Sequence, residues 1–329
     1  MKVLILSPKG RYDLYAPDCP SRREAELIFR DRTGTEEEWL AAGADAQVLV
    51  VTPVTHIRRE LIGQMPNLRL IQCDGVGFDR IDLEAAWQRG IYVCNNAGCN
   101  AGAVAELAVT LMSMLLHRTL WGDRMMKAGL HSQATQTLER NVPPDLSVSH
   151  VGLVGLGHIA LATAQRLRVN GSRVSYYARH RRTAEEEAAL GVGYLPLYEL
   201  AEQCDVISLH LPATAESRHL LDREFFAHVK PGAFLVNTAR GAIIDDDALC
   251  QAVRSGRIAG VALDAYEPEP AGADHPLVRL AAEFPDRIIL CPHQGGVSQA
   301  AFRNAVRMVF ENLDHILAGE RPERVINGL

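Results

Sequence analysis

A glycine-rich turn is the first feature of the sequence whose residue types and spacing suit chemistry. The apolar run VGLV leads into residues 155–160, GLGHIA, and a segment with apolar residues at helical spacing follows. Gly155 would permit a tight turn, Gly157 would let the backbone approach a pyrophosphate at the helix N-terminus, and Ala160 would allow close packing of helix on strand. The motif predicts dinucleotide binding, although S-adenosylmethionine sites use a similar turn and a merely glycine-rich loop would look alike. The expected cofactor contacts are Gly155, Gly157, His158 and Ile159.

A basic run stands where such a unit usually carries an acid. Residues 174–183 read VSYYARHRRT, so the expected second strand ends at Ala178 and basic residues follow it. An acid there would bind the ribose hydroxyls and repel a 2′-phosphate, whereas arginine offers a fork of donors. The run therefore predicts NADP(H) as the preferred cofactor, with NAD(H) as the alternative, and contacts at Arg179, His180 and Arg181. A solvated basic face at the start of a helix would have the same composition.

Length and composition describe a globular protein with two domains. The chain has 329 residues, 47% of them hydrophobic and 22% charged, and a net charge of −6, which does not favour nucleic-acid binding. The seven cysteines are scattered and form no C-x-x-C pair. This pattern is typical of proteins of the reducing cytoplasm and does not suggest a structural metal site. The longest apolar segment, from Val104, contains Glu106, His117 and Arg118, so we expect a buried or interfacial helix and no membrane span.

Short apolar runs alternate with helical segments along the whole chain. This alternation predicts an α/β protein with two doubly wound parallel-sheet domains. Expected strands begin near residues 2, 46, 68 and 91 in the first half and near 150, 173, 205, 232, 258 and 286 in the second. Helical spacing is expected at 22–31, 82–90, 246–256 and 298–320, the last ending at Gly319. We expect domain boundaries at 1–99, completed by 297–329, and at 100–296.

Five further motifs occur in a fixed order. They are GVGFDRID at 75–82, NAGAVAE at 100–106, NTARG at 237–241, DAYEPEP at 264–270 and CPHQGG at 291–296. Together with the glycine turn they resemble the D-isomer-specific 2-hydroxyacid dehydrogenase family, and the missing ribose acid resembles its glyoxylate/hydroxypyruvate reductase branch. The resemblance implies a flavodoxin-like substrate domain and a Rossmann dinucleotide-binding domain.

The resemblance also implies a catalytic set of Arg240, Glu269 and His293. Reduction of a 2-keto acid needs a proton on the carbonyl oxygen, and histidine titrates nearest neutrality. Glu269 would favour and orient the imidazolium, and Arg240 would pair with the substrate carboxylate. Taken singly, Arg240 could be a surface residue, Glu269 could be interchangeable with Glu267, and His293 could cap a strand.

Other contacts follow from the same resemblance. Substrate contacts are implied for the amides of Val76 and Gly77 and for Asn100. Further cofactor contacts are implied for Pro212, Thr238, Asp264 and Gly296, whereas His210 is better explained as a satisfied residue at a strand end. His158 and Gln294 depart from the family pattern at the pyrophosphate and beside the catalytic histidine.

The function implied is NADP(H)-dependent reduction of a small 2-keto acid to the D-2-hydroxy acid. The alternatives are an NAD(H)-preferring dehydrogenase and a non-catalytic regulatory protein that senses dinucleotides. The resemblance implies a symmetric dimer through the dinucleotide-binding domain, and the segment from Val104 to Met126 has more apolar residues than one buried stripe requires. Leu115, Leu116, Leu120 and Trp121 belong to this excess, so we expect part of the segment to pack against a partner in a homodimer.

Overall fold

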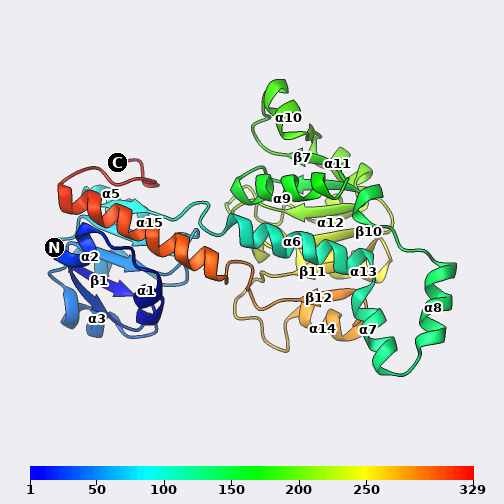
Figure 1. The fold of residues 1–329 in the computed structure, drawn as a ribbon, viewed down its shortest axis with the longest axis horizontal. Helices are drawn as coiled ribbons and strands as arrows, with labels where there is room; N and C mark the ends of the chain where they lie inside the picture. The colour runs from blue at the N-terminus through cyan, green and yellow to red at the C-terminus, as the bar shows by residue number, and fades with distance from the viewer. The chain divides into compact units, whose positions relative to one another are not determined.

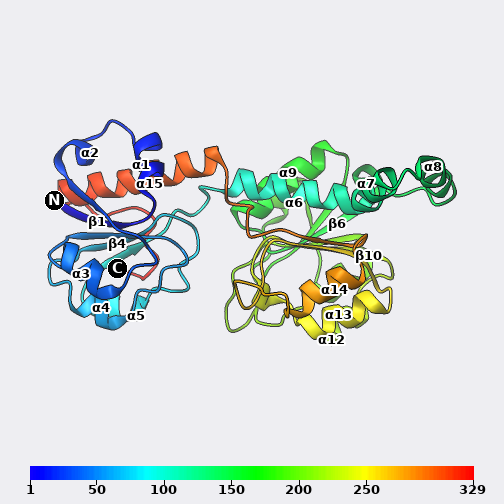
Figure 2. The same ribbon diagram turned by 90° about the horizontal axis from the view of Figure 1, so that it is seen from below.

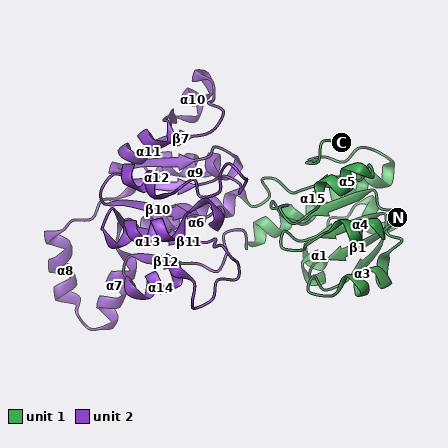
Figure 3. Cartoon of the chain, turned by 180° about the vertical axis from the view of Figure 1, so that it is seen from behind, with its two compact units in different colours: residues 1–100, 297–329 green, residues 101–296 purple.

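The computed structural model describes residues 1–329 and divides them into two compact units. One unit contains residues 1–100 and 297–329, and the other contains residues 101–296 (Figure 3). Each unit is a parallel β-sheet with helices on both faces, so the predicted α/β class with two parallel sheets is confirmed (Figure 2).

The sheet of the first unit has the strand order β2-β1-β3-β4-β5, with every pairing parallel. This is the order of the flavodoxin-like fold. Its strands are β1 (Lys2–Leu6), β2 (Glu26–Phe29), β3 (Val48–Val51), β4 (Leu70–Cys73) and β5 (Tyr92–Cys94). The helices are α1 (Lys9–Tyr15), α2 (Pro20–Glu24), α3 (Glu36–Gly43), α4 (Arg59–Gly63), α5 (Leu83–Gln88) and α15 (Gln299–Ala318).

Helix α15 covers one face of this sheet (Figure 1). Its apolar stripe, which includes Val306, Phe310 and Leu313, packs on Val3, Ile5 and other side chains of β1, β3 and β4. The opposite face is covered by α3, α4 and α5. The helix ends at Gly319, which adopts a left-handed conformation with φ of 76°, as its sequence predicts.

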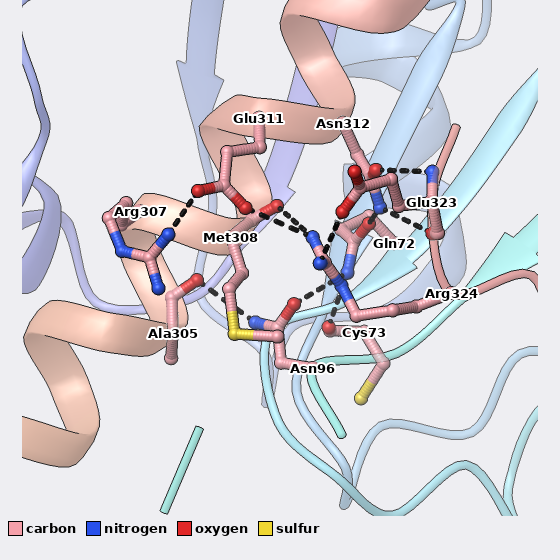
Figure 4. A network of polar contacts seen from close by, with 10 residues as sticks. All are labelled: Gln72, Cys73, Asn96, Ala305, Arg307, Met308, Glu311, Asn312, Glu323 and Arg324. Atoms are coloured by element: carbon pink, nitrogen blue, oxygen red, sulfur yellow. Dashed lines mark hydrogen bonds and ion pairs between the residues drawn. The ribbon is translucent and has the colours of Figure 1, made fainter. Parts of the chain in front are cut away.

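Buried amides tie α15 to the sheet (Figure 4). Asn312 Nδ2 donates to Gln72 Oε1 over 2.7 Å, and Gln72 Nε2 donates to Asn96 Oδ1 over 3.0 Å. Asn96 Nδ2 returns to the helix and donates to the carbonyl oxygen of Ala305 over 2.9 Å. Because each amide is fully buried, loss of one partner would leave another without a hydrogen bond at a cost of about 1–3 kcal/mol.

The prediction of one helix over residues 22–31 is wrong. Helix α2 ends at Glu24, and residues 26–29 form the edge strand β2, which pairs with β1. The sequence ELIF alternates in this strand, because Leu27 and Phe29 pack on the α15 side and Ile28 packs on the other. Four residues are too few for their apolar spacing to distinguish a helix from a strand. Pairing with β1 therefore decides the structure of this stretch.

The sheet of the second unit has the strand order β12-β11-β10-β9-β6-β7-β8. Numbered from β6, the last six strands have the Rossmann order, and β12 extends the sheet. The strands are β6 (His150–Val154), β7 (Arg173–Tyr177), β8 (Gly193–Tyr194), β9 (Val206–Leu209), β10 (Ala233–Asn237), β11 (Ile258–Leu263) and β12 (Ile288–Leu290).

Helices cover both faces of this sheet as well. Side chains of α6 and α9 form one apolar cluster with it, and those of α11, α12, α13 and α14 form the other. The helices are α6 (Ala101–Leu116), α7 (Thr119–Lys127), α8 (His131–Arg140), α9 (His158–Val169), α10 (Ala184–Leu190), α11 (Leu197–Gln203), α12 (Arg223–His228), α13 (Asp246–Arg254) and α14 (Pro276–Glu283).

The apolar segment from Val104 is two helices. The chain bends by 60° between α6 and α7 at Arg118, whose φ is 54°. No single helix has the length and apolarity to cross a membrane, and only this bent pair has them jointly. Within this segment Leu115, Leu116 and Trp121 are buried in their own chain, and Leu120 stays half-exposed. Leu115, Leu116 and Leu120 pack in the apolar cluster that covers one face of the second sheet.

Candidate active site

A pocket of about 600 Å³ opens at the turn between β6 and α9. Gly155 has a φ of 102°, and a Cβ there would lie 2.5 Å from the carbonyl oxygen of His210, so only glycine fits. A Cβ on Gly157 would meet nothing within 4 Å, so the backbone is open to a ligand at the start of α9. His158 and Ile159 form the first turn of α9, with His158 exposed, and Ala160 is fully buried against the sheet. The turn thus has the open backbone and helix N-terminus that a pyrophosphate requires.

Two buried polar atoms near the carboxyl ends of β9 and β10 have no partner. They are Nδ1 of His210, in the same pocket, and Oγ1 of Thr238. Burial lowers the pKa of His210 to about 3, so its ring is neutral, and its Nε2 lies 2.9 Å from Ser208 Oγ. Sequence analysis expected a satisfied His210, and the structure satisfies only one of its nitrogens. Orphaned atoms of this kind are rare in proteins, which fits a site that is completed by a polar ligand.

The structure divides the basic run after β7 into two pairs. All four residues of the run are exposed and line the pocket, but Arg179 and His180 make no hydrogen bond or ion pair within the chain. The guanidinium of Arg181 binds both oxygens of Glu187 at 2.9 and 3.0 Å, and Arg182 lies 3.3 Å from Glu186. The second pair therefore fixes the start of α10, whereas no internal hydrogen bond holds the side chains of the first pair, and the charge of Arg179 contributes to lowering the pKa of Glu216.

His293 and Glu269 form a close pair at the carboxyl ends of β12 and β11. Nδ1 of His293 lies 3.0 and 2.9 Å from the two carboxylate oxygens of Glu269. The hydrogen bond with Glu269 raises the pKa of His293, against the opposing effects of burial and of the Arg240 charge. Burial would raise the pKa of Glu269, but the hydrogen bonds from His293 and from the Tyr266 amide together lower it. The pair favours the protonated form of the imidazole, and its Nε2 is directed away from Glu269.

Arg240 belongs to the same group. It follows β10 in a turn that Asn237 closes, since Asn237 Nδ2 donates to the Arg240 carbonyl oxygen over 2.9 Å. The Arg240 charge contributes to lowering the pKa of both Glu269 and His293. Gly241 must be glycine, because a Cβ there would lie 2.0 Å from the carbonyl carbon of Tyr266. This close approach brings the Arg240 turn against the segment that carries Glu269.

Asp264 holds the loop that carries His293. Its buried carboxylate accepts hydrogen bonds from the amides of Gln294 and Gly295, each over 2.7 Å. Burial raises the pKa of Asp264, and the two amides oppose this effect. His293 has a φ of 55°, which is costly for a residue with a Cβ, and the two hydrogen bonds just after it stabilise that conformation.

The loop after β4 turns its carbonyl groups inward. The carbonyl oxygen of Gly75 accepts from the amide of Asn96 over 2.8 Å, and that of Val76 accepts from Asn95 Nδ2 over 2.7 Å. In a trans peptide the next N–H points the opposite way, so the amides of Val76 and Gly77 point away from these donors. Neither amide donates to an acceptor within the chain. The first unit thus presents two adjacent free amides, which is the arrangement that binds a carboxylate.

The remaining expected contacts are distributed over both units. Asn100, at the end of the segment after β5, has a buried Oδ1 with no partner. Pro212 is exposed in the pocket, and its carbonyl oxygen accepts from Ser217 Oγ over 2.7 Å. Gly296 is half-buried beside Gly295. No group of three or more His, Cys, Asp or Glu side chains is arranged to hold a metal ion.

Comparison with known proteins decides the family. Residues 109–295 match the family model described as D-isomer specific 2-hydroxyacid dehydrogenase, NAD binding domain. The chain belongs to this family. It is therefore an NAD(P)-dependent 2-hydroxyacid dehydrogenase, and the resemblance seen in the sequence is confirmed.

Individual relatives are similar to the dehydrogenase in sequence or structure over nearly its whole chain. A glyoxylate reductase from Thermofilum pendens is 34% identical over 298 residues, 91% of this chain and 86% of the relative. The crystal structure of the TT0316 protein from Thermus thermophilus matches with a TM-score of 0.83 at 32% identity, over 99% of this chain and 100% of that one. D-lactate dehydrogenase from Aquifex aeolicus, complexed with NAD and lactic acid, matches with a TM-score of 0.85 at 25% identity, over 100% of both chains.

Two residues of the dehydrogenase's site were missed by sequence analysis. Asn95 holds the carbonyl oxygen of Val76, and its only sequence signal is a doublet of asparagines at the end of an apolar run. Glu187 binds Arg181, and nothing distinguishes it in sequence from the neighbouring glutamates of α10. In both cases the role comes from a contact between separate elements.

Proposed function

We propose that this dehydrogenase uses NADP(H) to reduce a small 2-keto acid, glyoxylate or hydroxypyruvate, to the D-2-hydroxy acid. The observation that carries the proposal is the pair formed by His293 and Glu269, in which both carboxylate oxygens lie within hydrogen-bond distance of Nδ1 of an exposed imidazole. The name of the Thermofilum pendens relative supports glyoxylate as a substrate.

In the proposed mechanism the bound dinucleotide supplies a hydride to the carbonyl carbon. His293 donates the proton from Nε2 to the carbonyl oxygen, and Glu269 stabilises the imidazolium before the transfer and orients the ring through Nδ1. Arg240 pairs with the substrate carboxylate and polarises the carbonyl. The free amides of Val76 and Gly77 and the side chain of Asn100 are the groups of the first unit that we propose for substrate binding.

The residues around the glycine turn fit a dinucleotide. Gly155, Gly157, His158 and Ile159 would hold the pyrophosphate at the start of α9, and Arg179 with His180 would bind the 2′-phosphate of NADP(H). Pro212, Thr238 and Gly296 complete the proposed cofactor site. Asp264 would contact the nicotinamide amide through lone pairs that its two loop hydrogen bonds leave free.

The function is tested by a steady-state screen. Glyoxylate, hydroxypyruvate, pyruvate and phenylpyruvate are each supplied with NADPH and with NADH, and the loss of absorbance of the reduced cofactor is followed. We expect the highest kcat/KM for one of the first two acids with NADPH. Cofactor binding without turnover on any of the four acids would favour a regulatory protein instead.

Asn95→Ala is expected to raise KM for the keto acid by about 10-fold with a smaller change in kcat. Without its side chain the carbonyl oxygen of Val76 loses its donor, and the peptide that aims the Gly77 amide is free to turn. A charge-assisted hydrogen bond from the Gly77 amide to the substrate carboxylate is worth about 1.5–3 kcal/mol, and its partial loss accounts for a rise in KM of about 10-fold. Asn67→Ala, at an exposed position of the same unit, is the matched control. An unchanged KM for Asn95→Ala would remove the amides of this loop from the substrate site.

We propose that the dehydrogenase is a homodimer that associates through its dinucleotide-binding unit. Apolar side chains remain exposed after α6, with Met126 at 54%, Val142 at 79% and Val148 at 73%. Helices α7 and α8 extend from the sheet of this unit (Figure 1). Light scattering at micromolar concentration is expected to give twice the mass of the chain, and a monomer would contradict the proposal.

A further inference from the structure

A buried histidine outside the catalytic group begins helix α14. His275 is 5% exposed, and its Nδ1 accepts a hydrogen bond from the amide of Leu277 over 3.2 Å. Because Nδ1 is an acceptor, the proton of the neutral ring lies on Nε2. His275 is thus a helix cap at one nitrogen and a hydrogen-bond donor at the other.

Nε2 of His275 donates to the backbone of residues 266–270, the segment that carries Glu269. Nε2 of His275 lies 3.1 Å from the carbonyl oxygen of Glu267 and 3.6 Å from Asp246 Oδ2. Only the first distance is that of a hydrogen bond, so Glu267 is the acceptor. The ring of Tyr266 packs edge-on against the imidazole, with centroids 5.9 Å apart, and fixes its plane.

Few other hydrogen bonds hold the backbone of this segment. Residues 268 and 270 are prolines and have no N–H, and no other group in the chain donates to a carbonyl oxygen of residues 267–270. Upstream, Tyr266 is anchored by its hydroxyl, which donates to the Cys291 carbonyl oxygen over 2.8 Å, and its amide donates to Glu269 Oε1 over 2.9 Å. His275 supplies the one hydrogen bond to the backbone between Tyr266 and Glu269.

We propose that His275 is a positioning residue that holds Glu269 in place against Nδ1 of His293, a role that rests on the proposed acid–base function of that pair. Without the hydrogen bond to Glu267, the segment keeps its anchor at Tyr266 but gains freedom at the following peptide. The carboxylate then spends less time at 2.9–3.0 Å from the imidazole. Proton donation suffers although neither reacting group has changed.

Three substitutions separate positioning from folding. In His275→Asn the shorter amide keeps an oxygen that can cap α14 but no longer reaches Glu267. His275→Gln restores a donor of similar reach, and His275→Leu removes both functions. Asp246→Asn is the matched control, since Asp246 lies near the ring without a hydrogen bond to it.

We expect His275→Asn to lower kcat by about 10- to 100-fold, as for a misplaced catalytic group, while NADPH affinity and Tm stay near those of the parent. The descending limb of the pH profile of kcat/KM should move to lower pH, because Glu269 is the main group that raises the pKa of His293 and the other facing groups, Arg240 and Asp264, are unchanged. His275→Gln should recover most of kcat, and Asp246→Asn should resemble the parent.

Parent-like kcat and pH profile in His275→Asn would overturn the proposal. So would a loss of kcat that is accompanied by a lower Tm and an unmoved pH limb, since that describes a structural cap only. An effect of Asp246→Asn equal to that of His275→Asn would assign the role to the carboxylate instead. If His293→Gln fails to lower kcat, the proposed function fails, independently of His275.

Discussion

Replacing His293 with glutamine is expected to lower kcat by about 10²–10⁴-fold, the usual contribution of general acid catalysis, while the Kd of the cofactor changes little. Glutamine keeps a polar side chain of similar reach, but it cannot release a proton at neutral pH. The loop should keep its shape because Asp264 binds the backbone amides of Gln294 and Gly295 and not the imidazole. Stopped-flow turnover and fluorescence titration with NADPH measure the two quantities separately.

Two acids of the same segment serve as a matched pair for this experiment. Glu269→Gln should lower kcat and shift the descending limb of the pH profile to lower pH, because protonated His293 is the active form and Glu269 raises its pKa. Glu267→Gln changes an exposed side chain that touches neither group and should leave both quantities near those of the parent. Equal and large losses in the two variants would show that the assignment of Glu269 is wrong.

Arg179→Ala is expected to weaken NADPH by one to two powers of ten and to leave NADH nearly unchanged. Arg179 lines the pocket and makes no hydrogen bond or ion pair within the chain, so its guanidinium is available to a 2′-phosphate, and such a charge-assisted contact is worth about 1.5–3 kcal/mol. Ala178→Asp should shift preference the same way by repelling the phosphate and accepting from the ribose. The measurement is kcat/KM for both cofactors with one saturating keto acid, for the parent, each variant and the double variant.

The structure adds a control that the sequence did not offer. Arg181 is bound to Glu187, so Arg181→Ala should loosen the start of α10 and weaken both cofactors together, without changing their ratio. A parent that already prefers NADH, or an NADPH-to-NADH ratio that Arg179→Ala does not change, would mean that the basic run is only a solvated helix start.

Features with a local cause could be predicted from the sequence. The buried strands are continuous apolar runs, and the turn at residues 155–160 has a glycine where the backbone approaches His210. Where the cause was a distant contact, prediction failed. Residues 26–29 form a strand only because β1 lies beside them.

The same distinction applies within the candidate site. The types of Arg240, Glu269 and His293 indicate acid–base chemistry, and the structure brings these three side chains together in one unit. The residues that hold them, such as Asp264 and His275, act through backbone groups of other segments. A backbone partner, whether donor or acceptor, leaves no trace in the sequence, so these roles emerge only from the structure.

The inward-facing carbonyl groups after β4 bear on how this enzyme could be redesigned. The proposed anion contacts there are backbone amides, so almost any side chain at position 76 would leave the same two donors in place. A library of variants at this position would change the shape of the substrate site and keep the donors for the carboxylate. Position 95 behaves oppositely, because a residue that never meets the substrate sets the direction of the peptide that does. Varying the side chains of this loop while keeping Asn95 would therefore change which keto acid fits, and the backbone amides would still bind its carboxylate.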